Sequence, residues 1–114
     1  MYEYQATITR VVDGDTVEAD VDLGFQTYRS ERFRLYGINA PETKGDTRDA
    51  GRLATQHLID LLASHAPTNR VTIQTKRDKQ EKYGRYLAVL IANGVNINQR
   101  MVEDGHAVVY LIQE

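Results

Sequence analysis

The feature that most constrains the fold of this sequence is an alternation of apolar and polar residues interrupted by Asp13-Gly14. A period of two is typical of a strand with one buried face, and Asp-Gly between two such runs is a strong hairpin signal. A third run, YRSERFRLYGI at residues 28–38, should bury Phe33 and Leu35. We therefore expect a three-stranded antiparallel meander in the first half of the chain. Its first two strands alternate at Ile8, Val12, Val17, Ala19, Val21 and Leu23.

The period changes in the second half. Residues 47–65, TRDAGRLATQHLIDLLASH, have the spacing of an amphipathic helix and precede Pro67. Residues 70–76 and 85–94 predict short strands, residues 96–105 a second helix ending at Gly105, and residues 106–112 a last apolar run. No strand-helix unit repeats, so we expect an α+β protein built on a small antiparallel barrel. The stripe expected to face the core of the first helix is Ala50, Leu53, Ala54, Leu58, Leu61 and Leu62.

Composition limits the chemistry that is available. The 114 residues suit one domain spanning 1–114, and the absence of cysteine excludes disulfides, thiol nucleophiles and thiolate metal sites. Three scattered histidines argue against zinc, so oxygen atoms would have to hold any metal. No apolar run approaches the roughly 20 residues that cross a bilayer, and the first ten residues do not resemble a signal peptide. We expect no membrane partner and a cytoplasmic protein, unless it was cut from a longer precursor.

Charge is unevenly distributed along the chain, although the net charge is only −2. Residues 1–24 hold six acids and one base, whereas residues 70–85 hold six bases and two acids. Such runs usually form solvated faces. They would indicate a function if the fold brought both regions to one site.

The meander predicts such a site. The second strand starts beside the end of the third, so Asp15 should approach Asn39 and Glu42, and Pro41 should halt the strand there. Hard oxygen ligands at this rim suit Ca²⁺ or Mg²⁺. Simpler interpretations remain open: Asp13 and Asp15 as turn residues, Glu42 as a solvated acid, and Arg34 as an outward residue paired with Glu31 or Glu18.

The combination of three motifs favours function. VVDGDTV at 11–17, FRLYGINAPET at 33–43 and EKYGRYLAVL at 81–90 resemble the staphylococcal nuclease (thermonuclease) family, as does VNINQRMVEDGHA at 95–107. The resemblance covers nearly the whole chain in the family's order. It implies a five-stranded antiparallel OB-fold (Greek-key) barrel with two packed helices. It also implies a Ca²⁺-dependent phosphodiesterase that cleaves DNA and RNA with little sequence preference and leaves 3′-phosphates.

The same resemblance implies the metal ligands: the side chains of Asp15 and Asn39 and the main-chain carbonyl of Ala40. The family usually has aspartate at the position of Asn39. An amide oxygen can bind calcium but removes one full charge, so we expect weaker calcium binding.

The resemblance further makes Glu42 the residue that positions or activates water, and Arg34 and Arg85 the residues that hold the phosphate. The chemistry independently needs these types, because charge develops on phosphate oxygens and guanidinium groups bind those oxygens in pairs. Tyr83, next to Lys82, matches the family position where an aromatic ring meets the nucleotide, so we expect both residues to bind the substrate. Stacking of a base on the ring tolerates any sequence. For Tyr83, packing against the barrel rim is the alternative.

Other residues receive no catalytic role. Tyr36 should pack on the surface or on a helix, Tyr110 lies in a tail that matches the family poorly, and His57 and His106 should be packing residues.

Two alternatives stay open at the level of the whole protein. One is a catalytically weakened module that binds nucleic acid or protein without cleavage, which Asn39 favours. The other concerns assembly: the best-known family members continue into another helix after the position of Glu114, and a homodimer would cover the wall that this helix forms.

Overall fold

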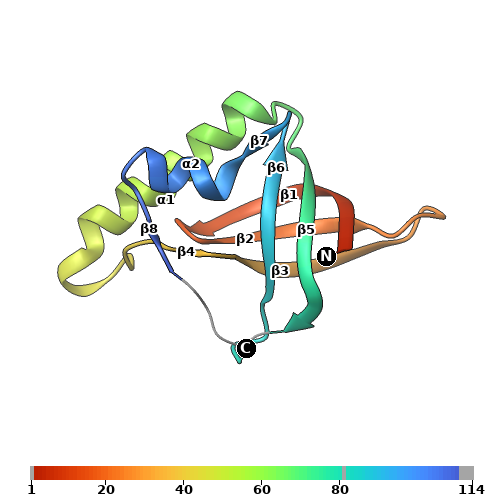
Figure 1. Cartoon of the computed structure of the whole chain (residues 1–114), viewed down its shortest axis with the longest axis horizontal. Coiled ribbons are helices and arrows are strands. Elements are labelled where there is room, and N and C mark those ends of the chain that lie inside the picture. Colours follow the sequence, from red (N-terminus) through yellow and green to blue (C-terminus); the bar gives the residue numbers. More distant parts are fainter. Residues whose placement is uncertain (1, 81, 111–114) are drawn as a thin grey trace.

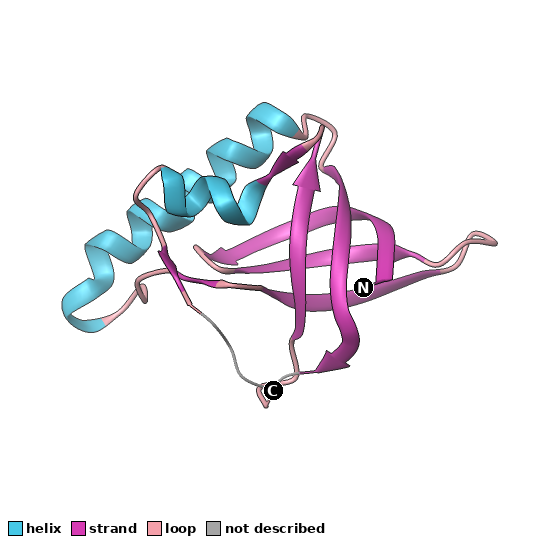
Figure 2. Cartoon of the chain, viewed as in Figure 1, coloured by secondary structure: helices cyan, strands magenta, loops and turns pink. Residues whose placement is uncertain are grey.

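The alternating segments in the first half of the chain form the predicted three-stranded antiparallel meander. In the computed structural model, which describes residues 2–80 and 82–110 without the side chains of 77–79, the first strand turns at Asp13-Gly14-Asp15 into the second, and the third returns beside it (Figures 1 and 2). The strands are β1 (Tyr2–Asp13), β2 (Thr16–Asp22), β3 (Tyr28–Leu35), β4 (Ile38–Asn39), β5 (Arg70–Gln80), β6 (Tyr86–Ala92), β7 (Val95–Asn96) and β8 (Val108–Val109). The helices are a 3₁₀ turn (Gly45–Thr47), α1 (Arg48–His65) and α2 (Ile97–Glu103).

The main sheet closes into a barrel. Its order is β3-β2-β1-β5-β6-β7, and an additional pairing joins β3 to β6. This confirms the α+β class and the five-stranded barrel with two helices, which Figure 2 shows on one side of the strands. The closing β3–β6 pair is parallel, whereas the other pairs among these five strands are antiparallel. Because Arg34 pairs with Leu87, closure brings the end of β3 beside the start of β6.

The core lies inside the barrel and under α1 and α2. Phe33 and Leu35 are buried as predicted. The helix stripe is partly wrong: Leu53 is 63% exposed and Ala50 is exposed, whereas Gly51 is buried. Leu53 lies on the far side of α1 from the residues that face the barrel, because 100° per residue places position 53 well away from them. The buried residues of α1 are Gly51, Ala54, Leu58, Leu61 and Leu62.

The described part of the last apolar run, residues 106–110, does not form a buried strand. Val108 and Val109 pair with the short β4 and are both mostly exposed. Leu111 and Ile112, which completed the predicted run, lie outside the described residues. Among the helices described, none is long and apolar enough to span a membrane.

Candidate active site

The Asp13-Gly14-Asp15 turn packs directly against the loop that follows β4. The main-chain N–H of Leu35 donates to the carbonyl of Asp15 over 2.8 Å. A Cβ on Gly14 would lie 2.8 Å from the Cβ atoms of both Ala40 and Ala54, so only glycine permits this approach. The predicted convergence of Asp15 with the end of β3 is therefore present, and a residue without a side chain makes it close.

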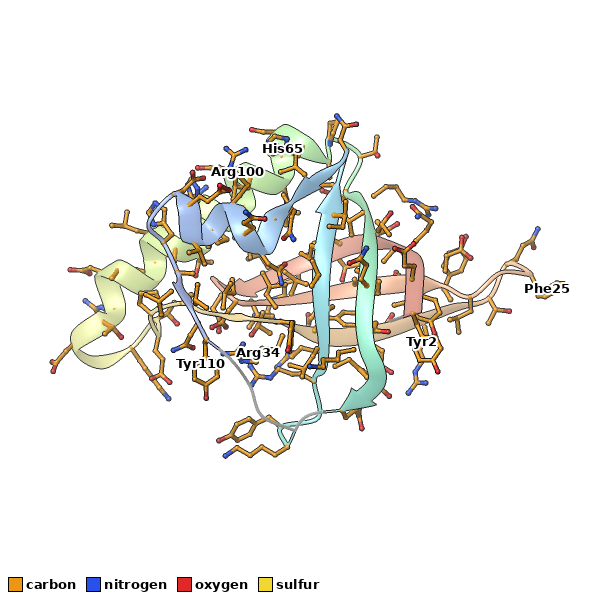
Figure 3. The ribbon with its side chains drawn as sticks, in the orientation of Figure 1. Tyr2, Phe25, Arg34, His65, Arg100 and Tyr110 are labelled. Carbon is orange, nitrogen blue, oxygen red and sulfur yellow. The ribbon has the colours of Figure 1, made fainter. Side chains whose placement is uncertain are left out.

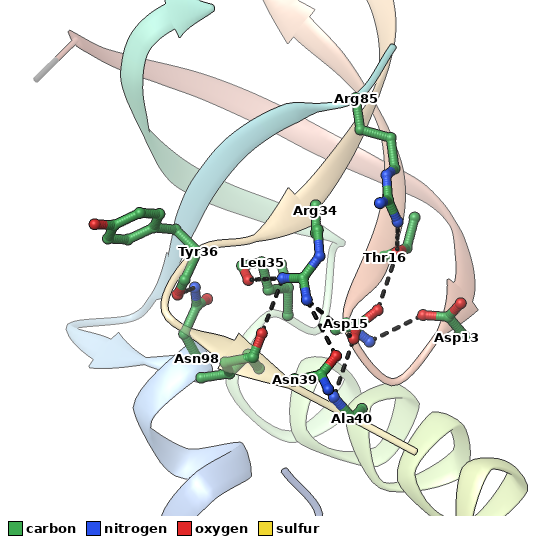
Figure 4. A network of polar contacts seen from close by, with 11 residues as sticks. Asp13, Asp15, Thr16, Arg34, Leu35, Tyr36, Asn39, Ala40, Arg85 and Asn98 are labelled. Atoms are coloured by element: carbon green, nitrogen blue, oxygen red, sulfur yellow. Dashed lines mark hydrogen bonds and ion pairs between the residues drawn. The ribbon is translucent and has the colours of Figure 1, made fainter. Parts of the chain in front are cut away.

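Asp15 is buried and is the centre of the polar network in Figure 4. Its Oδ1 accepts the hydroxyl of Thr16 at 3.2 Å, and its Oδ2 accepts the main-chain N–H of Ala40 at 3.0 Å. Arg34 Nη2 lies 3.8 Å from Oδ2. Asp15 is thus more than a turn residue, because its carboxylate joins β2 to the loop after β4.

Arg34 is also buried, at 8% exposure. Its Nη1 donates to the carbonyls of Leu35 (3.1 Å) and Ile38 (2.9 Å), and its Nη2 donates to Asn39 Oδ1 (3.1 Å). These bonds fix the guanidinium within the corner between β3 and β4, beside Asp15.

The alternative interpretation of Arg34 as an outward strand residue is wrong. Glu31 pairs with Arg29, and Glu18 pairs with Arg32 over 2.6 Å. The two acids expected to neutralise Arg34 on the surface therefore have other partners.

Arg85 reaches the network through a residue to which the sequence analysis gave no role. Arg85 Nη1 donates to Thr16 Oγ1 over 3.2 Å, and the same hydroxyl donates to Asp15. Thr16 is nearly fully buried. The signal that could have found it is its place in the DGDT motif, where a polar side chain occupies a core-facing strand position. The acidic and basic regions of the chain do converge here, although Glu81 and the side chains of 77–79 lie outside the described part.

Asp13 adds a second carboxyl close to Asp15. Its Oδ1 accepts the main-chain N–H of Asp15 over 3.0 Å. Burial raises the pKa of Asp13 from its ordinary value of 3.8 to about 6, and hydrogen bonding with the Asp15 carboxyl and its negative charge add to the rise. This rim therefore carries unfavourable negative charge at neutral pH.

This shift predicts a pH-dependent stability in metal-free protein. A carboxyl whose pKa is raised binds more protons in the folded state than in the unfolded state. The contribution of Asp13 to the free energy of unfolding therefore falls as pH rises from about 4 to about 6. We expect Asp13→Asn to raise the free energy of unfolding by roughly 1 kcal/mol at pH 7 and to leave it unchanged at pH 4, after discounting the pKa shift for solvent screening. Asparagine keeps the oxygen that accepts from Asp15. Urea unfolding in EDTA at both pH values measures the difference.

Asp22 provides the matched control for this substitution. Its Oδ1 makes the equivalent bond to the N–H of Gly24 at the β2–β3 turn, over 2.8 Å. Asp22 Oδ2 also lies 3.9 Å from Arg70 Nη2, so Asp22→Asn loses an ion pair and should not raise the free energy of unfolding at pH 7. An equal gain in both variants would contradict the account of Asp13.

Glu42 lies on the loop between β4 and α1, and its side chain is exposed. Its carbonyl accepts the hydroxyl of Thr47 over 2.8 Å, and a Cβ on Gly51 would lie 2.4 Å from that carbonyl oxygen. The backbone of Glu42 is thus fixed against the start of α1. Its carboxylate makes no hydrogen bond or ion pair with the described residues, so its predicted approach to Asp15 stays a prediction.

Lys82 and Tyr83 lie between β5 and β6, and both are exposed, Tyr83 at 71%. Lys82 Nζ is 5.0 Å from the centroid of the Tyr83 ring, and Arg85 Cζ is 5.5 Å from it. The exposure argues against packing on the barrel rim. Lys82 and Arg85 thus place two positive charges next to an exposed aromatic ring.

Asn98 supports the corner that holds Arg34, and the sequence analysis missed it. Its Oδ1 accepts the N–H of Leu90 (3.1 Å), and its Nδ2 donates to the carbonyls of Tyr36 (2.9 Å) and Ala88 (3.0 Å). Figure 4 shows Asn98 beside Tyr36 at this corner. Tyr36 itself contacts β5, because Lys76 Nζ donates to its hydroxyl over 2.7 Å.

The two histidines lie away from this network. His57 and His106 stack with ring centroids 4.3 Å apart, and His57 Nε2 is 2.7 Å from Asp104 Oδ2. The hydrogen bond with His57 lowers the pKa of Asp104. This cluster joins α1 to the end of α2, as expected of packing residues.

Known proteins match this chain along most of its length. A family model described as staphylococcal nuclease homologue matches residues 32–114. The chain belongs to this family.

Three relatives illustrate the match. An uncharacterized endonuclease of Escherichia coli O157:H7 is 36% identical over 104 residues, covering 90% of this chain and 59% of that protein. The thermonuclease of Staphylococcus intermedius is 32% identical over 103 residues, with 88% and 56% covered. Endonuclease YhcR of Bacillus subtilis (strain 168) is 30% identical over 119 residues, with 96% and 9% covered. This chain thus spans less than two thirds of each of these relatives.

The oxygen atoms of Asp15, Asn39 and Ala40 are the candidate ligands for a hard cation. Asp15 offers two carboxylate oxygens that each accept one hydrogen bond, and Asn39 Oδ1 accepts one from Arg34, so lone pairs remain on all three. Ala40 adds a main-chain carbonyl. No group of three His, Asp or Glu side chains in the described part of the chain could hold a metal. The donor set thus consists of oxygen atoms, the ligand type that hard cations prefer, with a single carboxylate among Asp15, Asn39 and Ala40.

Proposed function

We propose that this member of the staphylococcal nuclease homologue family is a Ca²⁺-dependent nuclease. It would hydrolyse DNA and RNA with little sequence preference and leave 3′-phosphates. The observation that carries the proposal is that Arg34 and Arg85 both approach Asp15. Arg34 lies directly beside its carboxylate, and Arg85 is linked to it through the hydroxyl of Thr16. Two buried or half-buried guanidinium groups beside one carboxylate are suited to a phosphate and a cation together.

The bonding of Arg34 leaves donors for a phosphate. A guanidinium has five N–H groups, and among the described residues Arg34 donates three hydrogen bonds, two from Nη1 and one from Nη2. The Nε–H and one N–H on Nη2 remain. These groups can form a fork that matches two phosphate oxygens, and the other bonds hold that fork in place before substrate arrives.

The remaining roles follow from position and chemistry. Asp15, Asn39 and the carbonyl of Ala40 would hold Ca²⁺, which, when bound, would supply positive charge for the developing charge on the phosphate. Glu42, whose main chain is held against the start of α1, would orient a water molecule and take its proton. Tyr83 would stack on a base without reading its identity, which accounts for low sequence preference.

Cleavage of denatured DNA with Ca²⁺ titrated from micromolar to tens of millimolar tests the proposal. We expect the wild type to cut, and Asn39→Asp to lower the half-saturating Ca²⁺ concentration by about tenfold, because affinity rises with ligand charge. An aspartate would also retain the oxygen that accepts from Arg34. Calcium binding measured directly by calorimetry should move in parallel.

Asn93→Asp is the matched control, because it adds the same charge on an exposed loop residue between β6 and β7. It should leave the Ca²⁺ requirement unchanged. If the wild type does not cut at any Ca²⁺ concentration but Asn39→Asp does, the binding module without cleavage is the better description. If neither cuts, the nuclease proposal fails.

A further inference from the structure

The β8 segment places a tyrosine against the guanidinium of the candidate site. β8 pairs antiparallel with β4, and the N–H of Tyr110 extends this ladder by donating to the carbonyl of Gly37 over 2.8 Å. Arg34 Cζ lies over the Tyr110 ring, 5.5 Å from its centroid, and Figure 3 shows the two side chains next to each other below β4. The strand that carries Asn39 therefore also aligns Tyr110 with Arg34.

The two side chains differ in exposure. Arg34 is 8% exposed, whereas Tyr110 is 48% exposed, so the buried guanidinium lies against a ring that is itself about half exposed to solvent. The N–H groups with which Arg34 donates to Leu35, Ile38 and Asn39 lie in the plane of the guanidinium group. The contact with the aromatic ring stabilises the guanidinium without occupying any of its N–H donors. The attraction between a cation and a ring is stronger where water is excluded.

We propose that Tyr110 is a positioning residue that holds Arg34 in the orientation that binds the reacting phosphate. This inference rests on the proposed nuclease function. Tyr110 acts through its ring and through the backbone of β8, and it leaves the Nε–H and Nη2–H groups of Arg34 to the phosphate. Its loss should act mainly on the transition state, where the charge on the phosphate oxygens is largest.

Steady-state cleavage of denatured DNA at saturating Ca²⁺ is the first test. We expect Tyr110→Leu to lower kcat about tenfold with KM changed less than twofold, and Tyr110→Phe to stay within about twofold of wild type, because the ring rather than the hydroxyl makes the contact. Tyr28→Leu is the matched control, since it removes an exposed tyrosine at the far end of β3. Wild-type kcat and KM in Tyr110→Leu would overturn the proposal.

A second readout needs no cleavage. In wild type and Tyr110→Phe, the ring current should shift the NMR signals of the Arg34 Nε–H and Cδ protons, and Tyr110→Leu should remove that shift. Equal Arg34 signals in wild type and Tyr110→Leu would overturn the positioning role, whatever the kinetics show. If the wild type does not cut, the proposed function fails, and this comparison alone then decides whether the Tyr110 ring contacts Arg34.

Discussion

Replacing Glu42 by glutamine should lower kcat for DNA cleavage by roughly 10²- to 10⁴-fold, the usual contribution of a general base. Glutamine keeps the size of the side chain but cannot take a proton from water. The melting temperature should not change, because the Glu42 side chain is exposed and its carboxylate has no partner among the described residues. The loop itself is held by its backbone, through Thr47 and the close approach of Gly51.

Glu103→Gln is the control for this experiment. Glu103 is an exposed acid on α2, so the change removes the same charge away from the candidate site. It should leave kcat within about twofold of wild type, as expected when no transition-state contact is lost. A Glu42→Gln variant as active as the Glu103→Gln variant would remove Glu42 from the mechanism.

Replacing Asn98 by alanine should lower the free energy of unfolding by about 2 kcal/mol, because the buried N–H of Leu90 and the partly buried carbonyl of Tyr36 lose the partner that Asn98 supplies, whereas the carbonyl of Ala88 still accepts the N–H of Tyr36. Asn98 is only 3% exposed and bonds to Leu90, Tyr36 and Ala88. Activity should also fall, since the Tyr36 corner orients the end of β3 that carries Arg34. Urea unfolding monitored by circular dichroism measures the stability loss.

Two further variants sharpen this prediction. Gln99→Ala changes the next residue of α2, which is exposed, and should cost less than about 0.5 kcal/mol. Asn98→Asp retains the oxygen that accepts from Leu90 but cannot donate to two carbonyls, so it should destabilise by an amount similar to alanine. An Asn98→Ala protein as stable as the Gln99→Ala protein would contradict the structural role given to Asn98.

Local patterns predicted most of the elements. The alternation around Asp13-Gly14 identified the meander, and helical spacing before Pro67 identified α1. These signals are local, because the strand period of two residues and the helix period of about 3.6 residues are both visible within a short segment of the chain. The predicted buried face of α1 was partly wrong: Leu53 faces solvent, and Gly51, which carries no hydrophobic signal, is buried.

The site was predicted in part. Sequence motifs selected Asp15, Asn39 and Arg34, which the structure joins in one network. They did not select Thr16 or Tyr110, which contact Arg85 and Arg34 respectively. Neither contact could be read from spacing, because 69 residues separate Thr16 from Arg85 and Tyr110 comes from a strand that pairs with β4 only in the folded chain.

By itself, the sequence determined the strands of the meander, the two helices, the exclusion of thiolate chemistry and the oxygen-rich character of the rim. Only the tertiary structure decided that β3 closes on β6 in parallel, which brings Arg85 to Thr16 and Asp15. It also decided that Arg34 is buried and that the Tyr110 ring lies against its guanidinium. The physical reason is that periodicity fixes which face of an element is apolar, whereas barrel closure fixes which distant ends of elements meet.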